Sequence, residues 1–173
     1  TSFTAQNLGA GRYDRIKKGT QQAMVVMGIM VAAAVGIGLL LTINDLYLHV
    51  FLSADKVTAE TVRFGNTYLY VDFAMYPFLG GIFLIRNCVQ GIGRSPFVLG
   101  AGGAELVARI AVCLLLPAAV AGGVVSAEAP PLAFYALCAA DPMAWIAADA
   151  VLSVPLIRNI FRMDYGYLRR EHA

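Results

Sequence analysis

Residues 20–43 read TQQAMVVMGIMVAAAVGIGLLLTI and contain no charged side chain, which constrains the fold more than any other feature of the chain. A helix of about 24 residues crosses the hydrocarbon core of a bilayer with some tilt. Gly28, Gly36 and Gly38 would weaken a helix in water, but in lipid small residues let neighbouring helices approach closely. The stretch therefore predicts a transmembrane helix.

Three more apolar stretches predict further spans at 64–89, 96–122 and 142–162. Only 14% of the residues are charged, whereas a soluble domain carries about 25%. We therefore predict an all-α integral membrane protein with a four-helix transmembrane region at 20–162. Asp141 and Pro142 are typical of a helix N-terminus, so residues 122–139 are expected to form a loop with a short interfacial segment. Trp145 is then expected near the outer interface.

The basic residues predict the orientation of these spans. Those on one side outnumber the two in the opposite loops, Lys56 and Arg63. The more basic side carries Arg12, Arg15, Lys17, Lys18, Arg86, Arg94, Arg158, Arg162, Arg169 and Arg170. Because basic loops stay in the cytoplasm, we expect a multi-pass protein of the cell inner (plasma) membrane with both ends cytoplasmic. Headgroups explain these charges, so the expected partners are the lipid bilayer and a small-molecule substrate, not a nucleic acid.

Enzyme and metal chemistry find no support in the sequence. Cys88, Cys113 and Cys138 are widely spaced in apolar surroundings, without a CxxC or Cys/His pattern. No HExxH, GxSxG or histidine pair supplies a nucleophile, base or metal ligand. We therefore expect no enzymatic activity, no disulfide, no metal site and no cofactor.

Four motifs, in order and at consistent spacing, resemble a known family. FTAQNLGAGRYDRIKKG at 3–19 is similar to the loop that ends an even-numbered helix in multidrug and toxic compound extrusion (MATE) transporters. IRNCVQGIGRSP at 85–96, GGAELVARI at 102–110 and DPMAWIAADAVL at 141–152 resemble the motifs of the helices that follow. The resemblance implies the last four helices of the second lobe of a MATE-type helical bundle.

The resemblance also implies the role of the flanking segments. Residues 1–19 are expected to be a cytoplasmic loop after a missing or truncated helix, and residues 163–173 a cytoplasmic tail. The missing N-terminal lobe of the same transporter then becomes an expected partner. The family-motif residues are Gln6, Asn7, Gly9, Arg86, Gln90, Gly91 and Gly93. All of them except Arg86 are expected to terminate helices and allow close helix approach.

Charged residues inside the predicted spans are candidates for function, because each costs about 3 kcal/mol or more in a bilayer. Glu105 and Arg109 are spaced i, i+4 and predict an ion pair. The pair is either structural, or it forms a gate or helps to bind a cation or substrate. Asp72 has Tyr68 and Tyr76 on its own face and is a candidate for cation coupling, with a hydrated interfacial aspartate as the alternative.

Asp149 is expected about 10 Å into the last span and has the same two interpretations. The resemblance implies a proton- or sodium-coupled multidrug antiporter that exports organic cations or amphipathic compounds by alternating access. Pro77, Pro117 and Pro155 interrupt spans, as in such transporters. The aromatic residues expected to face a cavity are Phe73, Tyr76, Phe78 and Phe83. Two alternatives stay open: a lipid-precursor flippase of the same superfamily, and a truncated membrane fragment without activity of its own.

Overall fold

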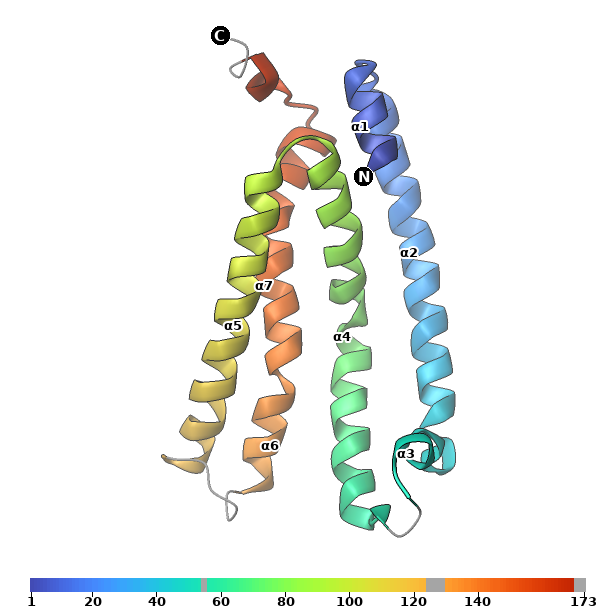
Figure 1. The fold of residues 1–173 in the computed structure, drawn as a ribbon, viewed down its shortest axis with the longest axis vertical. Helices are drawn as coiled ribbons and strands as arrows, with labels where there is room; N and C mark the ends of the chain where they lie inside the picture. The colour runs from blue at the N-terminus through green and yellow to red at the C-terminus, as the bar shows by residue number, and fades with distance from the viewer. Residues whose placement is uncertain (54–55, 124–129, 170–173) are drawn as a thin grey trace.

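A computed structural model describes residues 1–53, 56–123 and 130–169, and every regular element in them is helical (Figure 1). The elements are α1 (Ser2–Gly9), α2 (Tyr13–Leu41), η1 (Ile43–Asp45), α3 (Leu46–Phe51), α4 (Ala59–Gly91), α5 (Ser95–Ala121), α6 (Pro131–Cys138), α7 (Ala140–Pro155), the π-helical turn η3 (Leu156–Phe161) and η4 (Gly166–Arg169).

Four helical segments are long and apolar enough to cross a membrane. They are α2, α4, α5 and the composite of α6, α7 and η3 at Pro131–Phe161. The predicted all-α membrane fold is therefore confirmed. Figure 1 shows α1 and η4, the first and last of these elements, at one end of the bundle, as an even number of spans requires.

Residues 1–19 differ from the loop that we expected. Ser2–Gly9 form α1, and α2 already begins at Tyr13. The Asn7 side chain donates a hydrogen bond to the Phe3 carbonyl at 2.8 Å, and the Phe3 ring lies against Gly19 of α2. The hydrogen bond lies within α1, and the Phe3 contact packs α1 against α2 as a helical hairpin. Of the expected tail, residues 170–173, including Arg170, lie outside the described residues.

The fourth span begins earlier than the expected residue 142. Pro130 is extended and Pro131 occupies the first helical turn, where its missing N–H costs nothing. Only a single turn residue, Ala139, separates α6 from α7, and Asp141 makes no capping hydrogen bond. The short interfacial segment expected at 122–139 is thus part of the span from Pro131 onward, whereas residues 124–129 lie outside the described residues.

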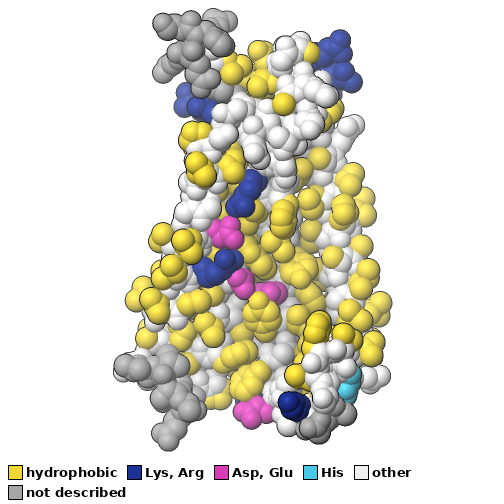
Figure 2. All heavy atoms as spheres, in the orientation of Figure 1, with side chains coloured by type: hydrophobic (Ala, Val, Ile, Leu, Met, Phe, Trp, Pro, Cys, Tyr) yellow, Lys and Arg dark blue, Asp and Glu magenta, His cyan; other side chains and the backbone are white. Residues whose placement is uncertain are grey.

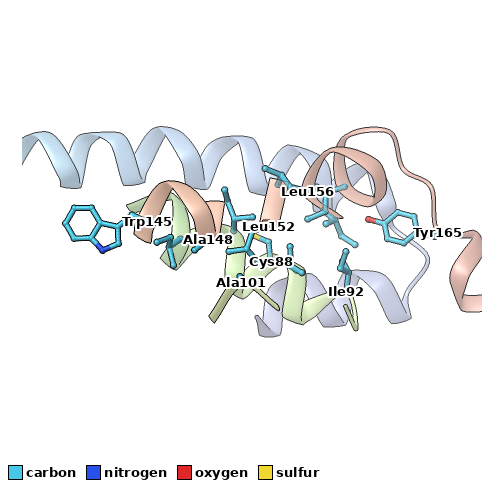
Figure 3. Close-up of a cluster of buried hydrophobic side chains, with 13 residues drawn as sticks. Cys88, Ile92, Ala101, Trp145, Ala148, Leu152, Leu156 and Tyr165 are labelled. Atoms are coloured by element: carbon cyan, nitrogen blue, oxygen red, sulfur yellow. The ribbon is translucent and has the colours of Figure 1, made fainter. Parts of the chain in front are cut away.

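The buried core lies where α7 packs against α4 and α5 (Figure 3). Ala140, Ala144, Ala148 and Leu152 of α7 recur every four residues and are buried. Since three of these side chains are single methyl groups, neighbouring helices can approach α7 closely. Trp145 is only 7% exposed and belongs to this core, so its expected interfacial position is wrong.

Two adjacent glycines of α4, Gly80 and Gly81, allow this helix to pack closely against α2 and α7. A side chain at Gly80 would meet Val31 and Met27 of α2, and one at Gly81 would meet the carboxylate of Asp149 in α7. The apolar surface of α2 away from α4 is exposed, which is costly in water and favourable in lipid. Helix α4 therefore packs closely against both α2 and α7, through Gly80 on one side and Gly81 on the other.

Candidate functional site

Ion pairs join α4, α5 and α7 in a continuous chain. Arg86 of α4 lies with its Nη2 3.1 Å from Glu105 Oε2 of α5. The Arg109 side chain places Nη2 3.3 Å from Glu105 Oε1 and Nε 3.0 Å from Asp141 Oδ1 of α7. In Figure 2, basic and acidic side chains alternate down the middle of the visible face, with hydrophobic side chains on both sides.

The series of linked side chains continues to α4 through Tyr68. The Tyr68 hydroxyl donates a hydrogen bond of 2.9 Å to Asp141 Oδ2, and it also faces the carboxyl group of Asp72. We call the connected residues the polar track; they are Arg86, Glu105, Arg109, Asp141, Tyr68 and Asp72. The polar track therefore begins at Arg86 of α4 and includes residues of α5 and α7. It ends at Tyr68 and Asp72 of α4, nearer the other end of the span.

Alternating charges make the track tolerable in an apolar environment. Each charge in a bilayer costs about 3 kcal/mol or more, and an adjacent opposite charge offsets much of that cost. Arg86 and Arg109 balance Glu105 and Asp141. The predicted Glu105–Arg109 pair is thus present, but it is one of three linked ion pairs, and the other two join different helices.

Asp72 is the carboxylate of the track for which the described residues supply no cationic partner. It is 8% exposed, and its Oδ1 has no hydrogen-bond partner among the described residues. Tyr76, which we expected beside it, instead packs its ring against Phe73 and Trp145, with centroids 5.4 and 6.3 Å apart. A deeply buried carboxyl with a free oxygen can accept a proton or a cation.

Asp149 is a second carboxylate without a hydrogen bond to its buried Oδ1 in the described part of the chain. It lies against Gly81 and near the guanidinium of Arg86. Because the span begins at Pro131, Asp149 is about 27 Å from its start, not the expected 10 Å. It therefore lies on the half of the bundle where the termini are.

The family-motif residues divide into close-packed and open positions. Gly91 packs so tightly against Thr1 and Thr4 that a side chain there would clash, as expected for close helix approach. Gly9 has open space around it, and the left-handed residue after α1 is Gly11, with φ +65°. Helix α1 does end at Gly9, but no neighbouring helix approaches that residue closely.

The other motif residues lie at the same end of the bundle. Gly93, with φ +79°, forms the turn between α4 and α5. Asn7 is buried, whereas Gln6 and Gln90 are exposed. Arg86 serves the polar track rather than a turn. Close packing and turn formation thus account for Gly91 and Gly93.

An apolar groove of about 520 Å³ lies between α2 and α4, lined by Met24, Val31, Phe73 and Pro77 among others. Of the four aromatic residues expected to face a cavity, Phe73 lines this groove, while Phe78 and Phe83 are 39% and 60% exposed on the bundle surface. The groove and the polar track therefore flank α4 on different sides.

The segment after η3 is tied back to the end of the fourth span. Arg158 Nε donates to Asp164 Oδ2 at 3.0 Å, and the Gly166 amide donates to Asp164 Oδ1 at 3.1 Å. The hydrogen bond from Arg158 holds the pKa of Asp164 below its ordinary value. The Tyr165 ring stacks on Tyr13 of α2 with centroids 4.2 Å apart. These contacts join the first and last spans.

Comparison with known proteins gives one match. A family model described as MatE matches residues 1–115, which covers α1, α2, α4 and most of α5. No curated protein and no solved structure matches the chain. Glu105 and Arg109 lie inside the matched range, whereas Asp141 and Asp149 lie beyond it.

Proposed function

The chain belongs to the MATE family, whose members are membrane transporters and not enzymes, and on that premise we propose that it forms part of a proton- or sodium-coupled antiporter exporting organic cations or amphipathic compounds. In this proposal Asp72 is the coupling carboxylate. A proton or sodium ion at Asp72 and a cationic substrate compete, so that binding of one favours release of the other.

The observation that carries the proposal is the burial of Asp72 with no cationic partner among the residues that the structure describes. Glu105 and Asp141 are both held by arginines, so neither can exchange a cation without breaking an ion pair. Asp72 has a free oxygen and a neighbouring hydroxyl, which can coordinate a small cation or share a proton. Asp149 is the second candidate, but the nearby Arg86 guanidinium disfavours a second cation there.

The paired arginines argue against a lipid-precursor flippase. Recognition of a phosphate headgroup requires a cation that is available to the ligand. Arg86 and Arg109 are each engaged with a carboxylate in the described bundle. An amphipathic organic cation fits better, because it needs no free arginine, and the groove lined by Phe73 on the other side of α4 offers an apolar surface to its body.

The proposal extends to the setting of the chain. We place both ends on the cytoplasmic side of the plasma membrane, since the basic residues of the sequence gather at the end where the termini lie. We also propose an N-terminal lobe as the partner that completes the pathway. The exposed apolar surface of α2 supports a neighbour there, or lipid.

The test is transport by the full chain reconstituted in proteoliposomes, with ethidium as a planar cationic probe. A proton or sodium gradient should drive ethidium movement by the native protein, and Asp72→Asn should abolish the dependence on the gradient. Glu60→Gln is the matched control, since Glu60 is an exposed acid in the first turn of the same helix. Gradient-driven transport by Asp72→Asn at the native rate would overturn the proposal.

A further inference from the structure

The Tyr68 hydroxyl lies between two carboxyl groups but has only one hydrogen to donate. In the structure that hydrogen goes to Asp141 Oδ2, 2.9 Å away. Asp72 also faces the hydroxyl, and its Oδ1 has no partner in the described part of the chain. An ionised Asp72 is only an acceptor, whereas a protonated one can donate to the Tyr68 oxygen. The arrangement therefore suits a neutral or cation-occupied Asp72.

The two carboxylates differ in how firmly they are held. Asp141 is fixed from α5, because Arg109 Nε lies 3.0 Å from Asp141 Oδ1 and the same guanidinium contacts Glu105. No arginine or lysine in the described part of the chain supports Asp72 in this way. Its other titratable and charged neighbours are Cys138 of α6 and Asp141 itself. The α2 side presents Gly38 to the Phe73 ring, which brings no charge.

We propose that Tyr68 is a positioning residue that couples the occupancy of Asp72 to the Arg109–Asp141 pair. With a proton or cation on Asp72, Tyr68 donates to Asp141 and ties α4 to α7. When Asp72 releases its proton to solvent, the Tyr68 hydrogen turns to the new carboxylate. Asp141 then keeps its ion pair with Arg109 of α5 but loses its hydrogen bond from Tyr68 of α4.

The consequence is a mechanical link between the coupling site and the packing of three helices. Asp141 stands on α7, Arg109 on α5 and Tyr68 on α4, so loss of one hydrogen bond loosens α4 against the α5–α7 pair. The inference rests on the proposed role of Asp72, and it adds the residue that transmits the state of Asp72 to the bundle.

The test compares Tyr68→Phe with Tyr70→Phe in the full chain. Tyr70 is half-exposed on the same helix, so its variant makes the same chemical change away from the two carboxylates. The measurement is the pH midpoint of ethidium transport in proteoliposomes, together with the KM for ethidium. Loss of a hydrogen bond to an ionised group should raise the midpoint by about one pH unit in Tyr68→Phe. Tyr70→Phe should leave it unchanged, and both should keep the native KM.

A second variant keeps the inference testable if Tyr68→Phe is poorly produced. Asp141→Asn removes the competing charge and frees the hydroxyl for Asp72, so the midpoint should fall. An unchanged or higher midpoint in Asp141→Asn alone would overturn the inference without any need for Tyr68→Phe. Where Tyr68→Phe is produced, the fall should be much smaller in its background, because no hydroxyl remains to be redirected. Equal shifts in both backgrounds would overturn the inference.

The outcomes separate the inference from the proposed function. If Asp72→Asn uncouples transport while Tyr68→Phe keeps the native midpoint, Asp72 is the coupling site and the role of Tyr68 is refuted. If Asp72→Asn leaves coupling intact, both are refuted. If Asp72→Asn uncouples transport and Tyr68→Phe alone shifts the midpoint, both are supported.

Discussion

Replacing Glu105 by glutamine should destabilise the bundle more than any other single neutralisation of the polar track. The change leaves Arg86 and Arg109 without the carboxylate that lies 3.1 and 3.3 Å from them. Removing one partner of a buried ion pair costs about 3–5 kcal/mol. The side chains of Arg86 and Glu105 are 33% and 23% exposed, so we expect a smaller loss, about 2–3 kcal/mol.

Charge balance gives this prediction its sharpest control. The double variant Glu105→Gln with Arg86→Gln restores neutrality, since the remaining Arg109 still pairs with Asp141. It should therefore be more stable than Glu105→Gln alone. Glu60→Gln, an exposed change on α4, should have no effect.

The assay is thermal survival of the detergent-solubilised full chain, followed by size-exclusion chromatography. For a domain of about this size, a loss of 2–3 kcal/mol corresponds to a drop in Tm of roughly 4–12 °C. The reasoning is refuted if Glu105→Gln has the same Tm as Glu60→Gln, or if adding Arg86→Gln to Glu105→Gln lowers the Tm further.

The remaining predictions concern packing, acid sensitivity and the second carboxylate. Gly81→Ala places a methyl group 2.7 Å from the Asp149 carboxylate and should lower the Tm, whereas Gly102→Ala, with open space around it, should not. Asp164 has a lower pKa in the folded protein than the ordinary aspartate pKa of about 3.9. Its contribution to stability is therefore fully present above about pH 3.9 and is lost as the pH falls through the pKa of the folded state. Hydrogen-exchange protection of the Gly166 amide should therefore fall at acid pH, and Asp164→Asn should remove that dependence; unchanged protection in the native chain would contradict it. Asp149→Asn should retain gradient-driven ethidium transport, and its loss would move the coupling site to that residue.

The spans were predictable because apolar length is encoded locally. The predicted 96–122 lies within one residue of α5, and 64–89 within five of the start of α4. The start of the fourth span was missed because Pro130 and Pro131 suggested a loop, although a proline in the first turn is compatible with a helix. Trp145 was misplaced for the same reason, since a span that starts at Pro131 carries it into the core.

The polar track was only partly predictable, because most of its links join distant residues. Glu105 and Arg109 are neighbours on one helix, so their spacing identifies the pair. Arg86 and Glu105 are 19 positions apart, and Arg109 and Asp141 are 32 apart. Those contacts depend on how α4, α5 and α7 pack. The sequence does show that each charge in a span needs a partner, because an unpaired charge in lipid is costly. It does not show which residue that partner is.

The most direct test of the account is cation release when substrate binds. Ethidium is added to the detergent-solubilised full chain, and a pH indicator and radioactive sodium report which cation leaves. If Asp72 is the coupling carboxylate, ethidium binding should release a proton or a sodium ion from the native chain and none from Asp72→Asn. Equal release from the two proteins would contradict the account.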